Sequence, residues 1–169
     1  MRELSERRVP LRGAPVPQSL FKYLLDLEIN KASRLRYCLS LVCLTPDVER
    51  AEVNPDLTRA IARMALHQLR STDLVTTLSR DVVALLLIDT DPRVLDRVLD
   101  RAANARLPEG RRFVRGGQVV SVSVGASCYP LTAPDRAALL REASQLMHRA
   151  RDEGGNRLIL PPLPASTTS

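Results

Sequence analysis

Arg70 and Asp73 are the two residues of this chain whose types and spacing most clearly indicate ligand chemistry. Arg70 ends a predicted helix and Asp73 begins a predicted hairpin, so a short connection places their side chains next to each other. A guanidinium offers paired donors that suit phosphate and the O6/N7 edge of guanine, and a carboxylate accepts from the donor edge of that base. In an arginine-rich chain the same pair also arises by chance, as a surface ion pair worth less than about 1 kcal/mol.

The elements that must position this pair follow from the spacing of apolar residues. Helical spacing predicts helices from Ser19, from Asp56 as a cap, from Pro92 to about Asn104, and from Pro134 to the glycines at 154 and 155. Apolar runs and alternation predict strands at residues 38–44, 73–77, 82–88, 113–114, 119–127 and 157–160. The order of these elements predicts an α+β fold with a central, mainly antiparallel sheet flanked by helices.

The composition describes one globular domain without a membrane span. The chain has 169 residues, of which 44% are hydrophobic, and no apolar run is long enough to cross a bilayer. We predict a flexible basic arm at residues 1–16, a domain at 17–160 and a disordered tail at 161–169. Cysteines at 38, 43 and 128 lie in apolar surroundings without pairing or metal-ligand spacing, which predicts buried free thiols in a reducing cytoplasm.

The charge of the chain has two explanations. The net charge is +6, and 23 of the 25 basic residues are arginine. This excess suits phosphate and guanine recognition, but codon bias in a GC-rich genome produces it as well. Aromatic residues make up only 3% of the chain, so it lacks the stacking platform of a single-strand binder. The composition therefore argues against a nucleic-acid partner.

Several segments in order along the chain resemble one bacterial family. Arg70 and Asp73 lie five residues before Ser79–Val83, and this layout resembles the Arg-x-x-Asp inhibitory site and catalytic hairpin of the GGDEF domain of diguanylate cyclases. Val122–Ala126, Tyr129–Pro130 and the stretch from Leu139 to Arg157 resemble its late strand and last helix. The resemblance covers roughly residues 18–160 and implies a palm-like sandwich of the nucleotidyl-cyclase kind.

The same resemblance indicates that catalysis has been lost. The hairpin at Ser79–Val83 differs from the family motif at four of its five residues, and Thr45 stands where the family has a metal-binding aspartate. Asp81, at the third hairpin position, is left as a single carboxylate, which would hold Mg²⁺ poorly. At the phosphate-binding positions of the last helix, Arg151 replaces lysine and Gly155 replaces arginine. We therefore predict no enzyme activity, no catalytic residue, no cofactor and no metal.

The resemblance also implies a binding site for the reaction product of the family, cyclic di-GMP. It implies that Arg70 and Asp73 contact the ligand and that Arg101 supplies a second guanidinium, while Arg80 lies close in sequence and adds a contact. The first hypothesis is a non-catalytic cyclic di-GMP receptor that acts through an unidentified protein partner or as a homodimer. The alternative is a pseudo-cyclase scaffold for protein–protein interaction, in which no nucleotide binds.

Overall fold

A computed structural model describes residues 14–102, 105–107, 110–115 and 118–165 of the chain. Most of the arm predicted at residues 1–16 and the turn predicted at Gly116–Gly117 lie outside these residues. Within them, seven strands form one sheet in the order β2-β3-β1-β6-β5-β4, with β7 paired to β6. The strands are β1 Leu39–Pro46, β2 Leu74–Thr77, β3 Val83–Ile88, β4 Ala105–Leu107, β5 Gly110–Arg115, β6 Gln118–Tyr129 and β7 Leu158–Ile159.

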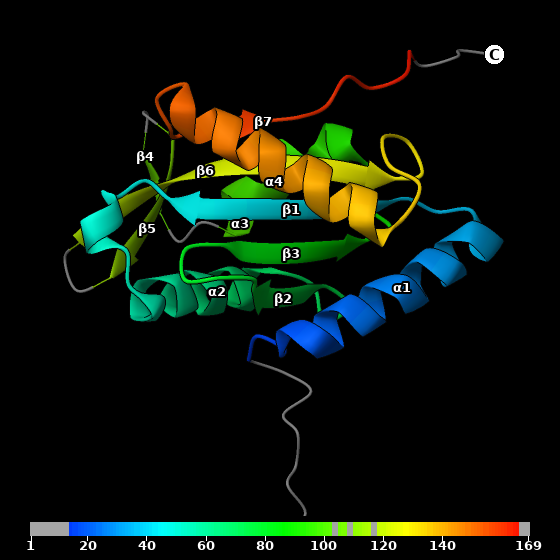
Figure 1. Cartoon of the computed structure of the whole chain (residues 1–169), viewed down its shortest axis with the longest axis horizontal. Helices are drawn as coiled ribbons and strands as arrows, with labels where there is room; N and C mark the ends of the chain where they lie inside the picture. Colours follow the sequence, from blue (N-terminus) through cyan, green and yellow to red (C-terminus); the bar gives the residue numbers. More distant parts are fainter. Residues whose placement is uncertain (1–13, 103–104, 108–109, 116–117, 166–169) are drawn as a thin grey trace, which may run out of the picture.

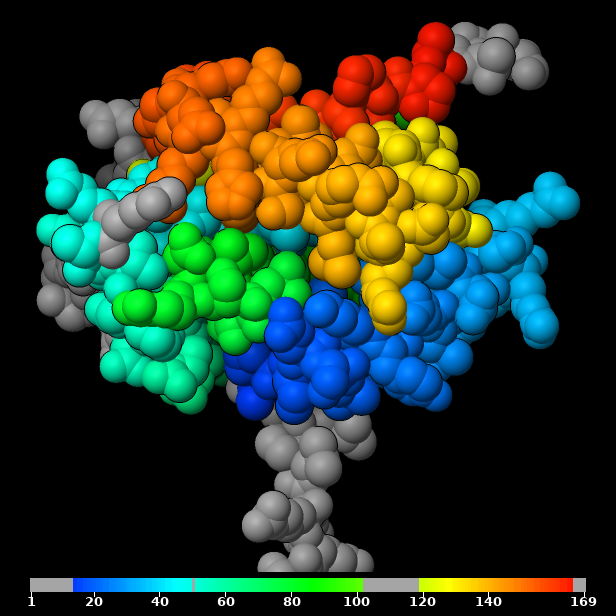
Figure 2. Space-filling view, in the orientation of Figure 1, coloured from blue at the N-terminus to red at the C-terminus, as the bar shows by residue number. Residues whose placement is uncertain are grey.

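The sheet confirms the predicted α+β architecture. All neighbouring strands are antiparallel except β6 and β7, which are parallel. The sheet is flanked by the helices α1 Gln18–Leu35, α2 Pro55–Gln68, α3 Leu95–Ala102 and α4 Arg136–Asp152, with short 3₁₀ turns η1 Arg50–Glu52 and η2 Pro92–Val94. Helices α1 and α4 cover one face, and α2 and α3 cover the other (Figure 1). Figure 2 shows the first of these faces, with α1 in blue and α4 in orange.

Two apolar cores, one on each face of the sheet, explain why β1 is an uninterrupted buried run. Val42 and Leu44 pack toward α2 and α3, whereas Leu41 and Cys43 pack toward α1 and α4. Every residue of β1 is buried. A strand that is covered on both faces needs apolar side chains in both directions, so it lacks the alternation of a half-exposed strand.

The cysteines are free, as predicted, but they differ in exposure. Cys43 and Cys128 are buried, and Cys38 is half-buried. Burial raises the pKa of the Cys43 thiol from its ordinary value of 9.0 to about 12. Burial, followed by the neighbouring Cys38, raises the pKa of the Cys128 thiol to about 12 as well. Both buried thiols therefore stay protonated at neutral pH and are poor nucleophiles.

Three helix starts differ from the predicted ones by one or two residues, and α3 begins three residues after the predicted Pro92 because Pro92–Val94 form the 3₁₀ turn η2. Asn54, rather than Asp56, caps α2, because its side chain accepts from the Leu57 N–H at 2.8 Å and Pro55 occupies the first helical position. Asp135 caps α4 in the same way, accepting from the Ala138 N–H at 2.8 Å. A side chain with an acceptor just before the first turn satisfies an N–H that has no helical partner.

Gly125 on β6 sets the distance between α4 and the sheet. A Cβ atom at this position would lie 2.2 Å from the backbone N of Met147 and 2.3 Å from the carbonyl oxygen of Ala143. Only a residue without a side chain allows such an approach of helix and strand. This close contact fixes α4, and with it the loop that follows Asp152, against the ends of β1 and β6.

The ends of the described chain touch the domain. The Val16 N–H donates to the Val75 carbonyl at 2.8 Å, and the Thr76 hydroxyl donates to the Val16 carbonyl at 2.7 Å, so Val16 lies along the β2 edge. At the other end, Pro161 is buried. None of the helices in the described part of the chain combines the length and apolar character that crossing a bilayer requires.

Candidate functional site

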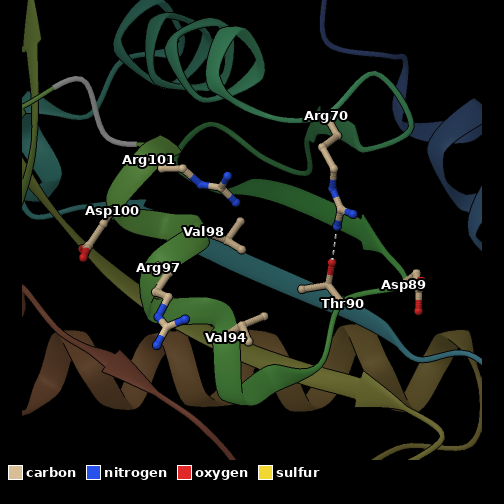
Figure 3. A pocket seen from close by; sticks show the side chains of 8 residues that line it. All are labelled: Arg70, Asp89, Thr90, Val94, Arg97, Val98, Asp100 and Arg101. Atoms are coloured by element: carbon tan, nitrogen blue, oxygen red, sulfur yellow. Dashed lines mark hydrogen bonds between the residues drawn. The ribbon is translucent and has the colours of Figure 1, made fainter.

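A cavity of about 710 Å³ opens where β3 ends, beside α3. Figure 3 shows Arg70 on one side of this cavity and Arg101 on the other, with the Arg101 guanidinium directed across the cavity toward the side of Arg70. The fold thus brings two of the four predicted residues together from segments that lie 31 positions apart. The cavity is lined by Arg70, Asp89, Thr90, Val94, Arg97, Val98, Asp100 and Arg101.

Arg70 is held in place by the end of β3. Its Nη2 donates to the Ile88 carbonyl at 3.0 Å and to the Thr90 hydroxyl at 2.7 Å, the bond drawn dashed in Figure 3. The Thr90 hydroxyl in turn donates to the Ile88 carbonyl at 3.0 Å. The Arg70 side chain is 55% exposed, so its remaining N–H groups face solvent and the cavity. Two fixed contacts orient this guanidinium before any ligand arrives.

Asp73 lies behind the cavity instead of lining it. Its side chain is 2% exposed. One carboxylate oxygen accepts from the Arg70 backbone N–H at 3.1 Å, and the other accepts from the Ile88 backbone N–H at 3.1 Å. The Arg70 Nε lies 3.7 Å from the first of these oxygens. The two side chains are therefore adjacent, as predicted, but the carboxylate is used to join the turn after α2 to the end of β3.

Arg80 lies at the opposite end of the β2–β3 hairpin, which corrects the expectation that it adds a ligand contact beside Arg70 and Asp73. Its Nη2 donates to the Val53 carbonyl at 3.2 Å, and its own carbonyl accepts from the Thr58 hydroxyl. The length of β3, six residues at about 3.3 Å each, separates it from the cavity by roughly 20 Å. Proximity in sequence is lost because the strand between them is extended.

The α3 side of the cavity is basic and partly apolar. Arg97 and Arg101 are exposed and lie four residues apart on one helix face. Val94 and Val98 provide apolar surface between them and the sheet (Figure 3). The lining holds three arginines and two aspartates, and among the described residues Arg101 has neither a hydrogen bond nor an ion pair. An unpaired guanidinium on an open cavity is suited to bind an anion or the acceptor edge of a base.

Thr90 is one of the cavity residues that the sequence did not single out. It is buried, and it links Arg70 to β3 through one hydroxyl. The available signal was the position of a threonine directly after a buried strand that ends beside Arg70.

The positions where the family resemblance expects metal ligands are Thr45 and Asp81. The Thr45 hydroxyl oxygen is buried without a hydrogen-bond partner. Asp81 accepts from the Ser79 hydroxyl at 2.9 Å and lies 3.8 Å from a nitrogen of Arg151. Arg151 also donates to the Val48 carbonyl at 2.7 Å. This region therefore offers one carboxylate, with a guanidinium beside it, where Mg²⁺ is usually held by one or two carboxylates together with substrate phosphates.

Asp47, directly after β1, makes hydrogen bonds to β6 and to the loop after α4. Its carboxylate accepts from the hydroxyls of Ser121 and Ser123 and from the Asn156 backbone N–H. Gly155, with φ of +74°, makes room for it, because a Cβ there would lie 2.9 Å from the Asp47 Cγ. Across the described residues, no group of three or more histidine, cysteine or acidic side chains is arranged to hold a metal ion.

Comparisons with known proteins identify the family and the fold of this chain. The family model for "Diguanylate cyclase, GGDEF domain" matches residues 56–157. No curated protein sequence matches the chain. Among solved structures, the GGDEF domain of YfiN (TpbB) from Pseudomonas aeruginosa is 25% identical with a TM-score of 0.71, over 91% of this chain and 94% of that one.

Two more distant structures share the fold. The GGDEF domain of DgcB from Caulobacter crescentus, solved in complex with cyclic di-GMP, is 13% identical with a TM-score of 0.63, over 89% of this chain and 92% of that one. SiaD from Pseudomonas aeruginosa, solved in complex with its activator SiaC, is 20% identical with a TM-score of 0.67, over 90% of this chain and 60% of that one. Since the family model spans more than half of the sequence, the chain belongs to the GGDEF domain family of diguanylate cyclases.

Proposed function

We propose that this protein is a non-catalytic GGDEF receptor that binds cyclic di-GMP in the cavity between Arg70 and Arg101. The observation that carries the proposal is the convergence of two guanidinium groups, one fixed and one unpaired, on a cavity of about 710 Å³. Cavities of about 300–1,000 Å³ commonly accommodate small ligands. The family acts in cyclic di-GMP metabolism, and the related DgcB domain was solved with this ligand.

The absence of turnover is part of the same proposal. Phosphoryl transfer between two nucleotides requires metal ions that neutralise charge on the phosphates. Here the Arg151 guanidinium lies near the remaining hairpin carboxylate, Asp81, and Thr45 replaces the other expected ligand. We expect no formation of cyclic di-GMP from GTP in the presence of Mg²⁺ or Mn²⁺. Accumulation of product, absent from an Asp81→Asn variant, would contradict this part.

Isothermal titration calorimetry with cyclic di-GMP tests the receptor proposal. We expect micromolar binding by the wild-type chain and a loss of about 10- to 100-fold in each of Arg70→Ala and Arg101→Ala, because a hydrogen bond to a charged group contributes about 1.5–3 kcal/mol. Arg149→Ala is the matched control, since it removes an equally exposed arginine from the outer surface of α4. Absence of heat with wild type, or equal affinity in Arg70→Ala, would end the proposal.

A scaffold that binds no nucleotide is the second candidate, and the outer face of α1 favours it. Leu20, Tyr23 and Leu27 are 40%, 64% and 43% exposed and follow one another at helical spacing. Such a stripe suits self-association. The scaffold candidate predicts a dimer by light scattering that a triple substitution to serine converts to a monomer, together with no heat on addition of cyclic di-GMP. A monomeric wild-type chain would exclude a scaffold that self-associates through α1.

A further inference from the structure

We propose that the cavity recognises a 6-oxopurine by its acceptor edge alone and does not detect the 2-amino group that distinguishes guanine from hypoxanthine. This inference rests on the proposed function, because it concerns the same ligand site. It follows from which hydrogen-bonding groups the cavity presents and which it withholds.

The groups that face the cavity from its two sides are donors. Within the described residues, all guanidinium N–H groups of Arg101 are available, and Arg70 keeps the guanidinium N–H groups that are not bound to Ile88 and Thr90. A guanidinium has no acceptor atom. These donors match O6 and N7 of a 6-oxopurine and the phosphate oxygens, whereas the 6-amino group of adenine presents hydrogens to them.

The carboxylate that would accept from the 2-amino group is not accessible. Asp73 is 2% exposed, and each of its oxygens already accepts from a backbone N–H. A ligand that reached this carboxylate would have to displace the turn after α2 from β3. Buried backbone donors that lose their acceptor cost about 1–3 kcal/mol each, so the contact would bring little net gain.

The two other carboxylates of the cavity do not replace Asp73. Asp89 and Asp100 line the cavity. Figure 3 shows both side chains directed away from the space between Arg70 and Arg101. A base held between the two arginines therefore presents its 2-amino group to solvent or to apolar surface, where its presence changes the affinity little.

The experiment compares three cyclic dinucleotides on the same full-length chain by calorimetry. Cyclic di-IMP differs from cyclic di-GMP only by lacking the 2-amino groups, and cyclic di-AMP replaces the acceptor O6 by an amino donor. We expect cyclic di-IMP to bind within about threefold of cyclic di-GMP, and cyclic di-AMP to bind at least about tenfold more weakly. Cyclic di-IMP binding more than threefold more weakly, or cyclic di-AMP binding as well as cyclic di-GMP, would overturn the inference.

A variant separates this inference from the proposed function. Asp73→Asn keeps one acceptor oxygen, and its folding can be checked by circular dichroism. We expect it to leave the ratio of cyclic di-GMP to cyclic di-IMP affinity unchanged. A selective loss of cyclic di-GMP affinity would show that position 73 reads the base, and would overturn the inference while the receptor function stands. Absence of binding of all three nucleotides by wild type would overturn both.

Discussion

Removal of the Asp73 carboxylate is expected to destabilise the fold whether or not a nucleotide is present. Asp73→Ala deletes the acceptor of two backbone N–H groups, each at 3.1 Å, from a side chain that is 2% exposed. Hydrogen bonds to a charged group contribute about 1.5–3 kcal/mol each. We therefore expect the free energy of unfolding to fall by about 3–5 kcal/mol, and by about 2 kcal/mol in Asp73→Asn, which keeps one acceptor oxygen.

The partner side chain should matter far less for stability. The Arg70 guanidinium is 55% exposed, and its 3.7 Å contact with the Asp73 carboxylate is worth less than about 1 kcal/mol at such a surface. The two hydrogen bonds from Nη2 to the Ile88 carbonyl and the Thr90 hydroxyl are made by the same exposed group, so Arg70→Ala is expected to lose about 1–2 kcal/mol in all, less than Asp73→Ala. The contrast between the two variants distinguishes a structural carboxylate from one that serves only the arginine.

Urea unfolding of the ligand-free, full-length chain measures these differences. For a chain of this size, about 2–4 °C of melting temperature corresponds to 1 kcal/mol, so Asp73→Ala should also melt about 6–20 °C below wild type. Asp152→Asn, a change at an exposed carboxylate on α4, is the control. The reasoning is refuted if Asp73→Ala unfolds within 1 kcal/mol of wild type, or if Arg70→Ala is destabilised as much as Asp73→Ala.

Three further predictions follow from other contacts. Thr90→Val should weaken cyclic di-GMP binding about 5- to 10-fold, and Thr90→Ser should restore it, because the Thr90 hydroxyl accepts a 2.7 Å hydrogen bond that orients Arg70. In an Arg70→Ala background, calorimetry should find no further loss of affinity on Thr90→Val, and a full additive loss would contradict this role. Gly125→Ala should lower the free energy of unfolding by about 3 kcal/mol or more, since its Cβ would meet the backbone of α4 at 2.2 Å; an unchanged urea midpoint would show that α4 shifts freely. The free energy of unfolding should fall as the pH rises from about 9 toward 12, because the folded chain keeps the thiol protons of Cys43 and Cys128 up to a pH of about 12, while unfolded cysteines lose theirs near 9.0. Urea midpoints at pH 8 and 10.5 test this prediction. Cys43→Ala should make the midpoint depend less on pH.

The architecture was predictable because its signals are local and physical. The uninterrupted apolar run at residues 38–44 indicated a buried strand, and the structure places helices on both sides of β1. Helix starts were less certain, since Asn54 and Asp56 both carry acceptors near the same turn. Only the backbone geometry shows that Asn54 is the residue whose oxygen reaches the free N–H.

The site was predictable in part. Spacing and family resemblance placed Arg70 and Arg101 in one site, and they do line one cavity. The spacing of Arg70 and Asp73 does not determine where the Asp73 carboxylate points. The same spacing is compatible with a carboxylate that faces solvent and with one that faces the end of β3. The contribution of Thr90 depends on its contact with Arg70, which lies 20 positions earlier in the sequence. Periodic patterns describe single segments and do not predict such a contact between two segments.

The fit of Asp47 against Gly155 has a consequence for any attempt to rebuild a cyclase from this chain. A single Gly155→Arg substitution would restore a basic side chain at the position where the resemblance expects one, but its first carbon would collide with a carboxylate that fastens β1 to β6 and to the loop after α4. The backbone at Gly155 is also in a left-handed conformation that arginine rarely adopts. A basic side chain at this position would thus require the Asp47 carboxylate to move, at the cost of the hydrogen bonds that join the end of β1 to β6 and to the loop after α4.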